Sequence, residues 1–352
     1  MDTPQFIEHI SHNTPFTPFS VNWVPCSAKL AVVGCHARGS GVIQLLEMTG
    51  STLKLLSSTD RPTGIKCSTF AASSYEQRQL ATGDYSGQLQ TWDVSDLTRP
   101  VFSVQAHSSI INSIDGCGGL NIGAGAAELV TGSRDGNVRV WDVRQSEPVA
   151  ALEPEGGAAG RDCWAVAFGH AYNDTERTVA AGYDNGDVKL LCLRTNRLLW
   201  ETNVNNGVVA LQFDRKDIQM NKLVVTSLES KYRVYDMRTL HPTSGYAGST
   251  LTAHSSTVWS VRHVPSNRDV WLTTGGNGSM QLSKYEYPAQ RTRKVEGGEE
   301  GVMGEVTVVA KGKWGDQPIV STEWHAEKVG LLATASLDQQ VRVGIVTKLN
   351  NL

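Results

Sequence analysis

A pattern of two short apolar strands joined by a tight turn recurs along the whole chain. The clearest copy, LVTGSRDGNVRVWDVR at 129–144, has its turn at Arg134, Asp135 and Gly136 and closes with a Trp-Asp pair. Six weaker copies occupy 30–48, 79–95, 178–194, 222–238, 271–287 and 331–347. A unit of this size cannot bury both faces of its sheet alone, so consecutive copies have to pack against one another.

The spacing of the copies indicates the architecture. One turn position recurs at intervals of 44 to 61 residues, slightly longer than the WD-repeat period of about 40–45. An apolar strand precedes each copy, as in CWAVAF at 163–168, and a short outer strand follows, as in EPVAAL at 147–152. Four strands per copy and seven copies predict an all-β fold, a seven-bladed WD40 β-propeller. The aligned turn residues are Ser40, Ser86, Asp135, Asn185, Glu229, Asn277 and Asp338.

The two ends of the chain predict how the ring closes. The last copy ends at VTKLNNL without an outer strand, whereas QFIEHI at 5–10 precedes the first copy. We expect residues 5–10 to complete the last blade, so that 1–352 form a single propeller without an open sheet edge.

The charged segment 289–304 lacks strand alternation and is expected to be a mobile surface loop of the sixth blade. The Gly-rich segment 116–126 interrupts the third blade and has no phosphate-loop pattern.

Charge and cysteine usage exclude several classes of protein. Lysine plus arginine number 32 and aspartate plus glutamate 35, a net charge of −3 that argues against general nucleic-acid binding. No run of 18 apolar residues is present, and the N-terminus lacks the pattern of a signal peptide. The six cysteines are dispersed without a CxxC pair, which favours a reduced, cytoplasmic protein that does not bind a membrane.

Serine, histidine and aspartate occur together in the third repeat, a combination also found in hydrolase triads. No GxSxG nucleophile elbow accompanies them. In a WD repeat the same residue types form a buried hydrogen-bond network, which is tolerated only when it is fully satisfied. The predicted structural network consists of His107, Thr131, Ser133, Asp135 and Trp141.

The sixth repeat departs from this pattern. It keeps His254 but has Asn277 in the aspartate column and Ser283 in place of the tryptophan. We therefore expect a weaker network there and a less rigid blade than the third. The sequence holds no HExxH motif and no cluster of His, Cys, Asp and Glu at metal-ligand spacing, so we predict no catalytic residue, no metal site and no cofactor.

One rim of the predicted propeller holds the remaining candidates. It is formed by the turn before the third strand and the start of the first strand of each blade. Two tryptophans, a tyrosine and an arginine at these positions are typical of binding hot spots. The alternative is that Trp164 and Trp259 pack between blades. The predicted protein-binding rim consists of Lys66, Tyr85, Asn112, Arg134, Asp162, Trp164, Asp184 and Trp259.

Several stretches go beyond a generic repeat, among them NWVPCSAK at 22–29, RDCWAVAFGHAYN at 161–173, FDRKDIQMNKLV at 213–224 and VRVGIVTKLN at 341–350. With the seven-copy spacing they resemble the Monad family of WD-repeat proteins over essentially the entire chain. The resemblance implies a cytoplasmic adaptor without a catalytic domain, with the cilium or flagellum as a second location. It implies, as partners, a co-chaperone complex of RuvB-like AAA ATPases and a prefoldin-like module, contacted through its tetratricopeptide subunit. It also implies dynein heavy chains as clients, in the pre-assembly of axonemal dynein arms for motile cilia.

Two other readings stay open. A substrate receptor of a cullin-type ubiquitin ligase would rest on the Trp-Asp-x-Arg pattern at 141–144 and its near copy at 235–238, although the pattern is also the ordinary ending of a repeat. Another WD-repeat peptide-binding module belongs to the same class. An enzyme is the third reading, and no motif favours it. We expect the protein on its own to be a monomer.

Overall fold

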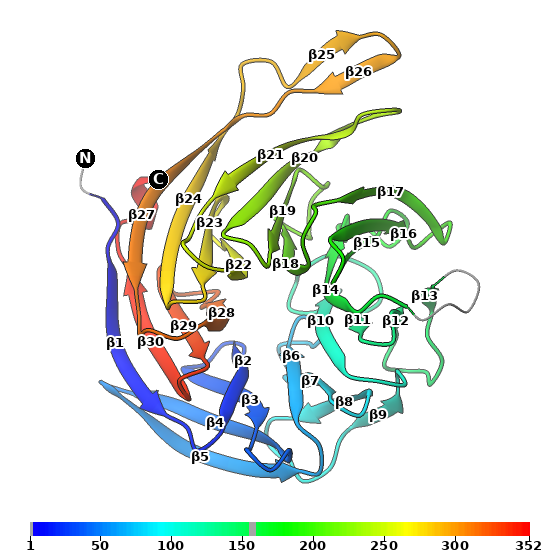
Figure 1. Ribbon diagram of the computed structural model, residues 1–352. Helices are drawn as coiled ribbons and strands as arrows, with labels where there is room; N and C mark the ends of the chain where they lie inside the picture. The colour runs from blue at the N-terminus through cyan, green and yellow to red at the C-terminus, as the bar shows by residue number, and fades with distance from the viewer. Residues whose placement is uncertain (1–2, 155–159) are drawn as a thin grey trace.

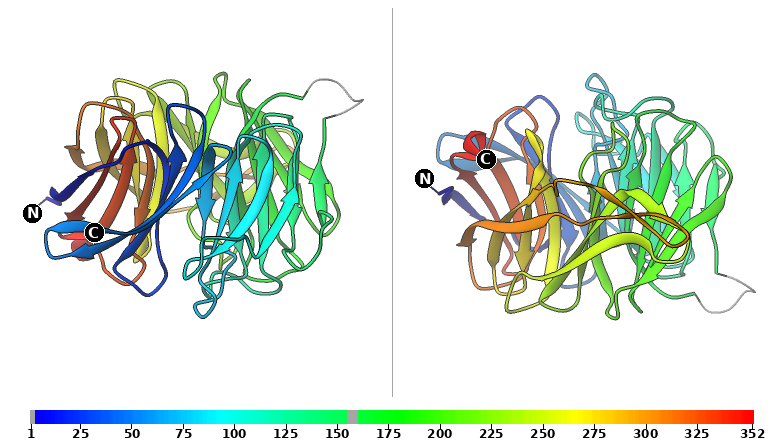
Figure 2. Two further views of the ribbon diagram at one scale, coloured as in Figure 1. Left: turned by 90° about the horizontal axis from the view of Figure 1, so that it is seen from below. Right: turned by 90° about the horizontal axis from the view of Figure 1, so that it is seen from above.

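Seven four-stranded antiparallel sheets surround a central channel in the computed structural model, which describes residues 3–154 and 160–352 (Figure 1). Each sheet is one blade, and the blades follow one another in the order of the sequence. Figure 2 shows the ring edge-on. The predicted seven-bladed propeller is therefore confirmed. No described helix is long and apolar enough to cross a membrane.

The strands of each blade are given from the channel outwards. Blade one has β2 (Thr17–Trp23), β3 (Lys29–Cys35), β4 (Gly41–Thr49) and β5 (Thr52–Arg61). Blade two has β6 (Ile65–Thr69), β7 (Gln79–Asp84), β8 (Gln88–Asp93) and β9 (Phe102–Gln105). Blade three has β10 (Ile111–Cys117), β11 (Glu128–Ser133), β12 (Val138–Trp141) and β13 (Ala150–Leu152). Blade four has β14 (Cys163–Gly169), β15 (Thr178–Tyr183), β16 (Asp187–Cys192) and β17 (Arg197–Asn203).

The remaining blades follow the same plan. Blade five has β18 (Val208–Phe213), β19 (Lys222–Ser227), β20 (Lys231–His241) and β21 (Gly245–Thr252). Blade six has β22 (Val258–Val264), β23 (Asn267–Gly275), β24 (Ser279–Glu286) and β27 (Glu305–Lys313). Blade seven has β28 (Ile319–Trp324), β29 (Leu331–Ser336), β30 (Gln340–Val346) and β1 (Phe6–Asn13). A 3-10 turn, η2 (Leu349–Asn351), follows β30. Every repeat copy found in the sequence forms the second and third strands of a blade.

The N-terminal strand closes the ring, as predicted from the missing outer strand of the last copy. β1 pairs antiparallel with β30, with Phe6 opposite Val346 and Asn13 opposite Gln340. The strand extends three residues beyond the predicted 5–10. Phe6 lies so close to Gly312 of blade six that an added Cβ there would be 2.5 Å from its ring. The first strand thus joins the sheet of blade seven and also packs on blade six.

The core lies between adjacent blades, where alternate residues of each strand interdigitate. At the junction of blades seven and one, Ile10, Val21 and Val343 belong to one buried cluster. Polar groups of the inner strands also bond across the seams. The Phe168 amide donates to Asp115 Oδ2 at 2.9 Å, and the Ser260 and Thr322 hydroxyls are 2.8 Å apart. Each blade therefore buries the faces of its neighbours, as the repeat argument requires.

The segment 289–304, predicted to be a mobile surface loop without strand alternation, contains a β-hairpin. β25 (Thr292–Val295) pairs with β26 (Gly298–Gly301), and the hairpin lies along β20 of blade five (Figures 1 and 2). Arg291 Nη2 is 2.6 Å from Asp236 Oδ2 of blade five. The alternation was hidden because the facing residues of the two strands are charged, with Arg293 opposite Glu300.

Candidate protein-binding collar

The inner strand of every blade carries a β-bulge near its start. At each bulge one residue lacks a partner in the second strand, and a bulge of this kind turns its side chain away from the regular alternation. All seven bulge residues line the central channel, a cavity of about 860 Å³. We call these residues the collar. They are Phe19, Lys66, Asn112, Trp164, Val209, Trp259 and Val320.

Five of the seven collar residues are apolar, and all seven are half-buried. Leu228 and Leu337, from the turns that follow β19 and β29, line the same cavity. Leu228 is 41% exposed. The mouth of the channel is therefore an apolar surface that contains two tryptophans and a phenylalanine, interrupted by Lys66 and Asn112.

Four of the eight predicted rim residues belong to the collar: Lys66, Asn112, Trp164 and Trp259. The Trp164 ring packs on Gly207 of the next blade, where an added Cβ would be 2.7 Å from the ring. Trp259 lies beside Gly276 of its own blade, 3.2 Å from such a Cβ. One part of each indole is thus packed while another faces the channel. Trp164 therefore packs between blades, as the alternative reading expected, and Trp259 packs within its own blade; the binding role of both tryptophans stays a prediction.

The other four predicted rim residues do not line the cavity and lie in the surrounding turns. Arg134 Nε is 3.7 Å from Asp162 Oδ2, and the Asp184 amide donates to the Asp162 carbonyl at 2.9 Å. The Tyr85 ring is 6.2 Å from that of Phe19, and burial raises the pKa of Tyr85 to about 12. Of these four residues, Tyr85 is in ring contact with a collar residue, and the other three bond with one another.

Sequence reasoning missed Phe19, Val209 and Val320. The signal was present, because these residues occupy the same repeat column as Trp164 and Trp259. An apolar residue beside other apolar residues in a strand reads as core, so only its place at a bulge reveals that it faces the channel.

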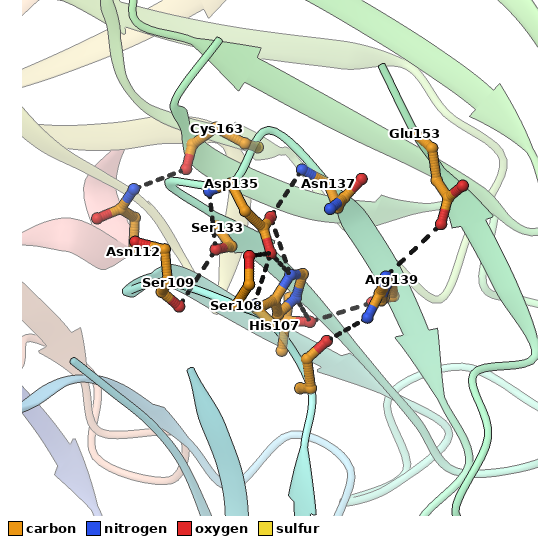
Figure 3. A network of polar contacts seen from close by, with 12 residues as sticks. His107, Ser108, Ser109, Asn112, Ser133, Asp135, Asn137, Arg139, Glu153 and Cys163 are labelled. Carbon is orange, nitrogen blue, oxygen red and sulfur yellow. Dashed lines mark hydrogen bonds and ion pairs between the residues drawn. The ribbon is translucent and has the colours of Figure 1, made fainter. Parts of the chain in front are cut away.

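Four of the five side chains of the predicted blade-three network are buried, and Figure 3 shows its part around His107, Ser133 and Asp135. Thr131 is its centre: the Trp141 indole donates to Thr131 Oγ1 at 2.9 Å, and His107 Nε2 is 2.7 Å from the same oxygen. His107 Nδ1 is 3.2 Å from Asp135. Burial opposes ionisation of Asp135, but hydrogen bonds led by that from His107 hold its pKa well below the usual range.

The position of Ser133 does not match a nucleophile–base pair. Its hydroxyl donates to the Ser109 carbonyl at 3.4 Å and accepts from the Asp135 amide at 3.2 Å, whereas His107 bonds with Thr131. A hydrolase would need the serine within hydrogen-bond reach of the histidine. The arrangement instead links the loops of one blade.

The sixth blade keeps a histidine network with other partners, and its predicted weakness relative to blade three stays a prediction. His254 Nδ1 is 2.7 Å from Ser279 Oγ, which donates to Asn277 Oδ1 at 2.6 Å. The other ring nitrogen is 3.0 Å from Thr273 Oγ1. Ser279 therefore links the histidine to the turn residue Asn277, whereas in blade three the histidine contacts the turn residue Asp135 directly. Ser283, at the tryptophan position, accepts a hydrogen bond from the Tyr232 hydroxyl.

The geometry gives no support to a metal site, and three of the six thiols are inert. Within 3–154 and 160–352 no group of three or more His, Cys, Asp and Glu side chains could hold a metal ion. All six cysteines are free thiols. Burial raises the pKa of Cys67, Cys117 and Cys163 to about 12, which keeps these thiols protonated and unreactive.

The ring of seven sheets and the Trp–Thr–His–Asp network define a WD-repeat β-propeller. The family model described as WD domain, G-beta repeat matches residues 98–142 and 245–282. The chain is 56% identical to dynein axonemal assembly factor 10 of Homo sapiens and 55% identical to that of Xenopus laevis. Both alignments cover 100% of this chain and 99% of the relative. The factor from Chlamydomonas reinhardtii is 49% identical, over 99% of this chain and 98% of the relative.

The chain therefore belongs to the dynein axonemal assembly factor 10 family of WD-repeat proteins. This confirms the resemblance found in the stretches outside the repeats.

Proposed function

We propose that this protein is a non-enzymatic adaptor for the cytoplasmic pre-assembly of axonemal dynein arms. The observation that carries the proposal is the identity of 49–56% over essentially the full length to factors named for axonemal dynein assembly. The architecture is suited to this role, because a closed propeller is a rigid body with several surfaces that are accessible at once. Holding two partners on one body raises their effective concentration for each other.

The proposed partners are a co-chaperone complex and its clients. The complex contains RuvB-like AAA ATPases and a prefoldin-like module, and this protein contacts it through its tetratricopeptide subunit. The clients are dynein heavy chains. We assign one of these contacts to the collar. Half-exposed aromatic side chains on a rigid support form hot spots at low entropic cost, because little conformational freedom is lost on binding.

The ubiquitin-ligase reading gains nothing from the structure. In the Trp-Asp-x-Arg segment Trp141 is buried, and Arg144 Nε donates to Asp142 Oδ1 at 2.8 Å within the same turn. The pattern stabilises its own blade end.

Quantitative affinity purification from the cytosol of a ciliated cell tests the proposal. The wild type is compared with the Trp164→Ala, Trp259→Ala double variant and with a control, Leu198→Ala, Leu199→Ala, which removes two exposed leucine side chains from the outer strand β17. We expect the RuvB-like ATPases or dynein heavy chains to be lost with the collar variant only, provided that all three proteins melt alike.

Unchanged capture by the collar variant would move the contact to another surface. If the wild type retained neither group and captured a ubiquitin-ligase adaptor instead, the adaptor function itself would be wrong.

A further inference from the structure

Lys66 is a cation without a carboxylate partner at the mouth of the channel. Its ammonium lies 4.4 Å above the Phe19 ring, and burial lowers its pKa. Among the residues that the structure describes, no carboxylate is within ion-pairing distance of Lys66. By contrast, Lys216 and Arg262, which line the same channel, are paired with Asp115 and Glu323. A partly desolvated charge without a counter-ion is unfavourable, and an incoming anion would relieve that cost.

The residues around Lys66 restrict which class of molecule can carry that anionic group. The other collar residues are apolar apart from Asn112, whose side-chain amide already donates to the Cys163 carbonyl at 3.0 Å. A nucleic acid would need several cations along its phosphates, and the collar holds one. The cavity of about 860 Å³ is large enough for several side chains of a peptide.

From this combination we propose that the collar binds a protein segment in which an aspartate or glutamate adjoins a large apolar side chain. The carboxylate bonds with the Lys66 ammonium, and the apolar side chain packs between Trp164 and Trp259. The inference rests on the proposed adaptor function and specifies the chemistry of the segment that its partner presents. Phe19 has a second role, since its ring holds the ammonium at the cavity edge.

Synthetic ten-residue peptides test this directly. Each carries a central Leu, Phe or Trp followed by Asp, Glu, Asn, Gln or Lys between Gly-Ser spacers, and binding to the full chain is followed by fluorescence anisotropy. We expect acidic peptides to bind the wild type roughly tenfold more tightly than their amide counterparts, as for hydrogen bonds between charged groups.

Three variants test whether the preference for acidic peptides depends on the Lys66 side chain. In Lys66→Met the acid-over-amide ratio should fall below about twofold, because the stem remains and the charge is lost. Lys66→Arg should keep a preference for acid, and Lys54→Met, on the exposed outer strand β5, should behave like the wild type. Thermal denaturation checks that each variant is folded.

Equal binding of acid and amide peptides to the wild type, an acid preference that survives Lys66→Met, or no binding of any peptide would overturn the inference. These outcomes differ from failure of the proposed function. If Trp164→Ala, Trp259→Ala loses the cellular partners but Lys66→Met keeps them, only the chemistry assigned to the segment is wrong. If both variants keep all partners while the peptides discriminate, the collar binds such segments but does not carry the adaptor contact.

Discussion

At the scale of single residues, Thr131 stabilises more of blade three than its size suggests. Its hydroxyl meets both the Trp141 indole and the His107 ring, and none of the three side chains is more than 2% exposed. Thr131→Val keeps the shape and leaves these buried groups without their shared partner. We expect it to lower the free energy of unfolding by about 2–4 kcal/mol in urea denaturation. Thr250→Val, on the exposed outer strand β21, should change it by less than about 0.5 kcal/mol. A similar loss in both variants would contradict the network's role.

At the scale of elements, β1 contributes an entire strand from the far end of the chain. Removing residues 1–12 deletes most of the pairing with β30 and the contact of Phe6 with Gly312, so blade seven becomes an open edge. We expect the melting temperature to fall sharply, by roughly 10 °C or more, as several kcal/mol of strand pairing and packing are lost. Calorimetry of a form lacking only residues 1–3 is the control. A shift of a few degrees for both forms would refute the closure.

The hairpin of β25 and β26 gives a second prediction at this scale. Arg291 Nη2 donates to Asn221 Oδ1 at 2.9 Å and to Asp236 Oδ2 at 2.6 Å, and Asp236 is 1% exposed. Arg291→Met leaves that carboxylate unpaired, so amide hydrogen exchange of 292–301 should speed up while the rest of blade six is unchanged. The exposed Lys294→Met is the matched control. Fast exchange of 292–301 already in the wild type would show that the hairpin does not hold to blade five.

At the scale of the whole molecule, buried histidines tie stability to pH. Burial lowers the pKa of both His254 and His263 from 6.5 to about 4. The unfolded chain therefore binds more protons than the folded chain between about pH 6.5 and 4. The free energy of unfolding should fall as the pH drops through this window, by roughly 1–3 kcal/mol for each histidine. Denaturant titrations at pH 7, 5.5 and 4.5 measure the slope. His263→Gln should flatten it, and an unaltered slope would show that this group does not titrate on unfolding.

The amino-acid sequence by itself determined the number of blades, the two central strands of each blade, the closing strand and the residues of the blade-three network. These features depend on alternation and on residues close together in a repeat, such as Thr131 and Trp141, which are ten positions apart. Four collar residues were also within reach, because they share a column of the repeat.

Only the tertiary structure decided how the blades meet. The Trp23 indole donates to the carbonyl of Glu323, 300 positions away. The bulges at Phe19, Val209 and Val320 are register shifts between the first two strands of a blade, and the channel that these residues line exists only once the ring has closed. The tertiary structure also decided that the hairpin packs on blade five and that Lys66 has no carboxylate partner. Whether a charge has a partner depends on what neighbouring blades place beside it, and repeat patterns contain no such information.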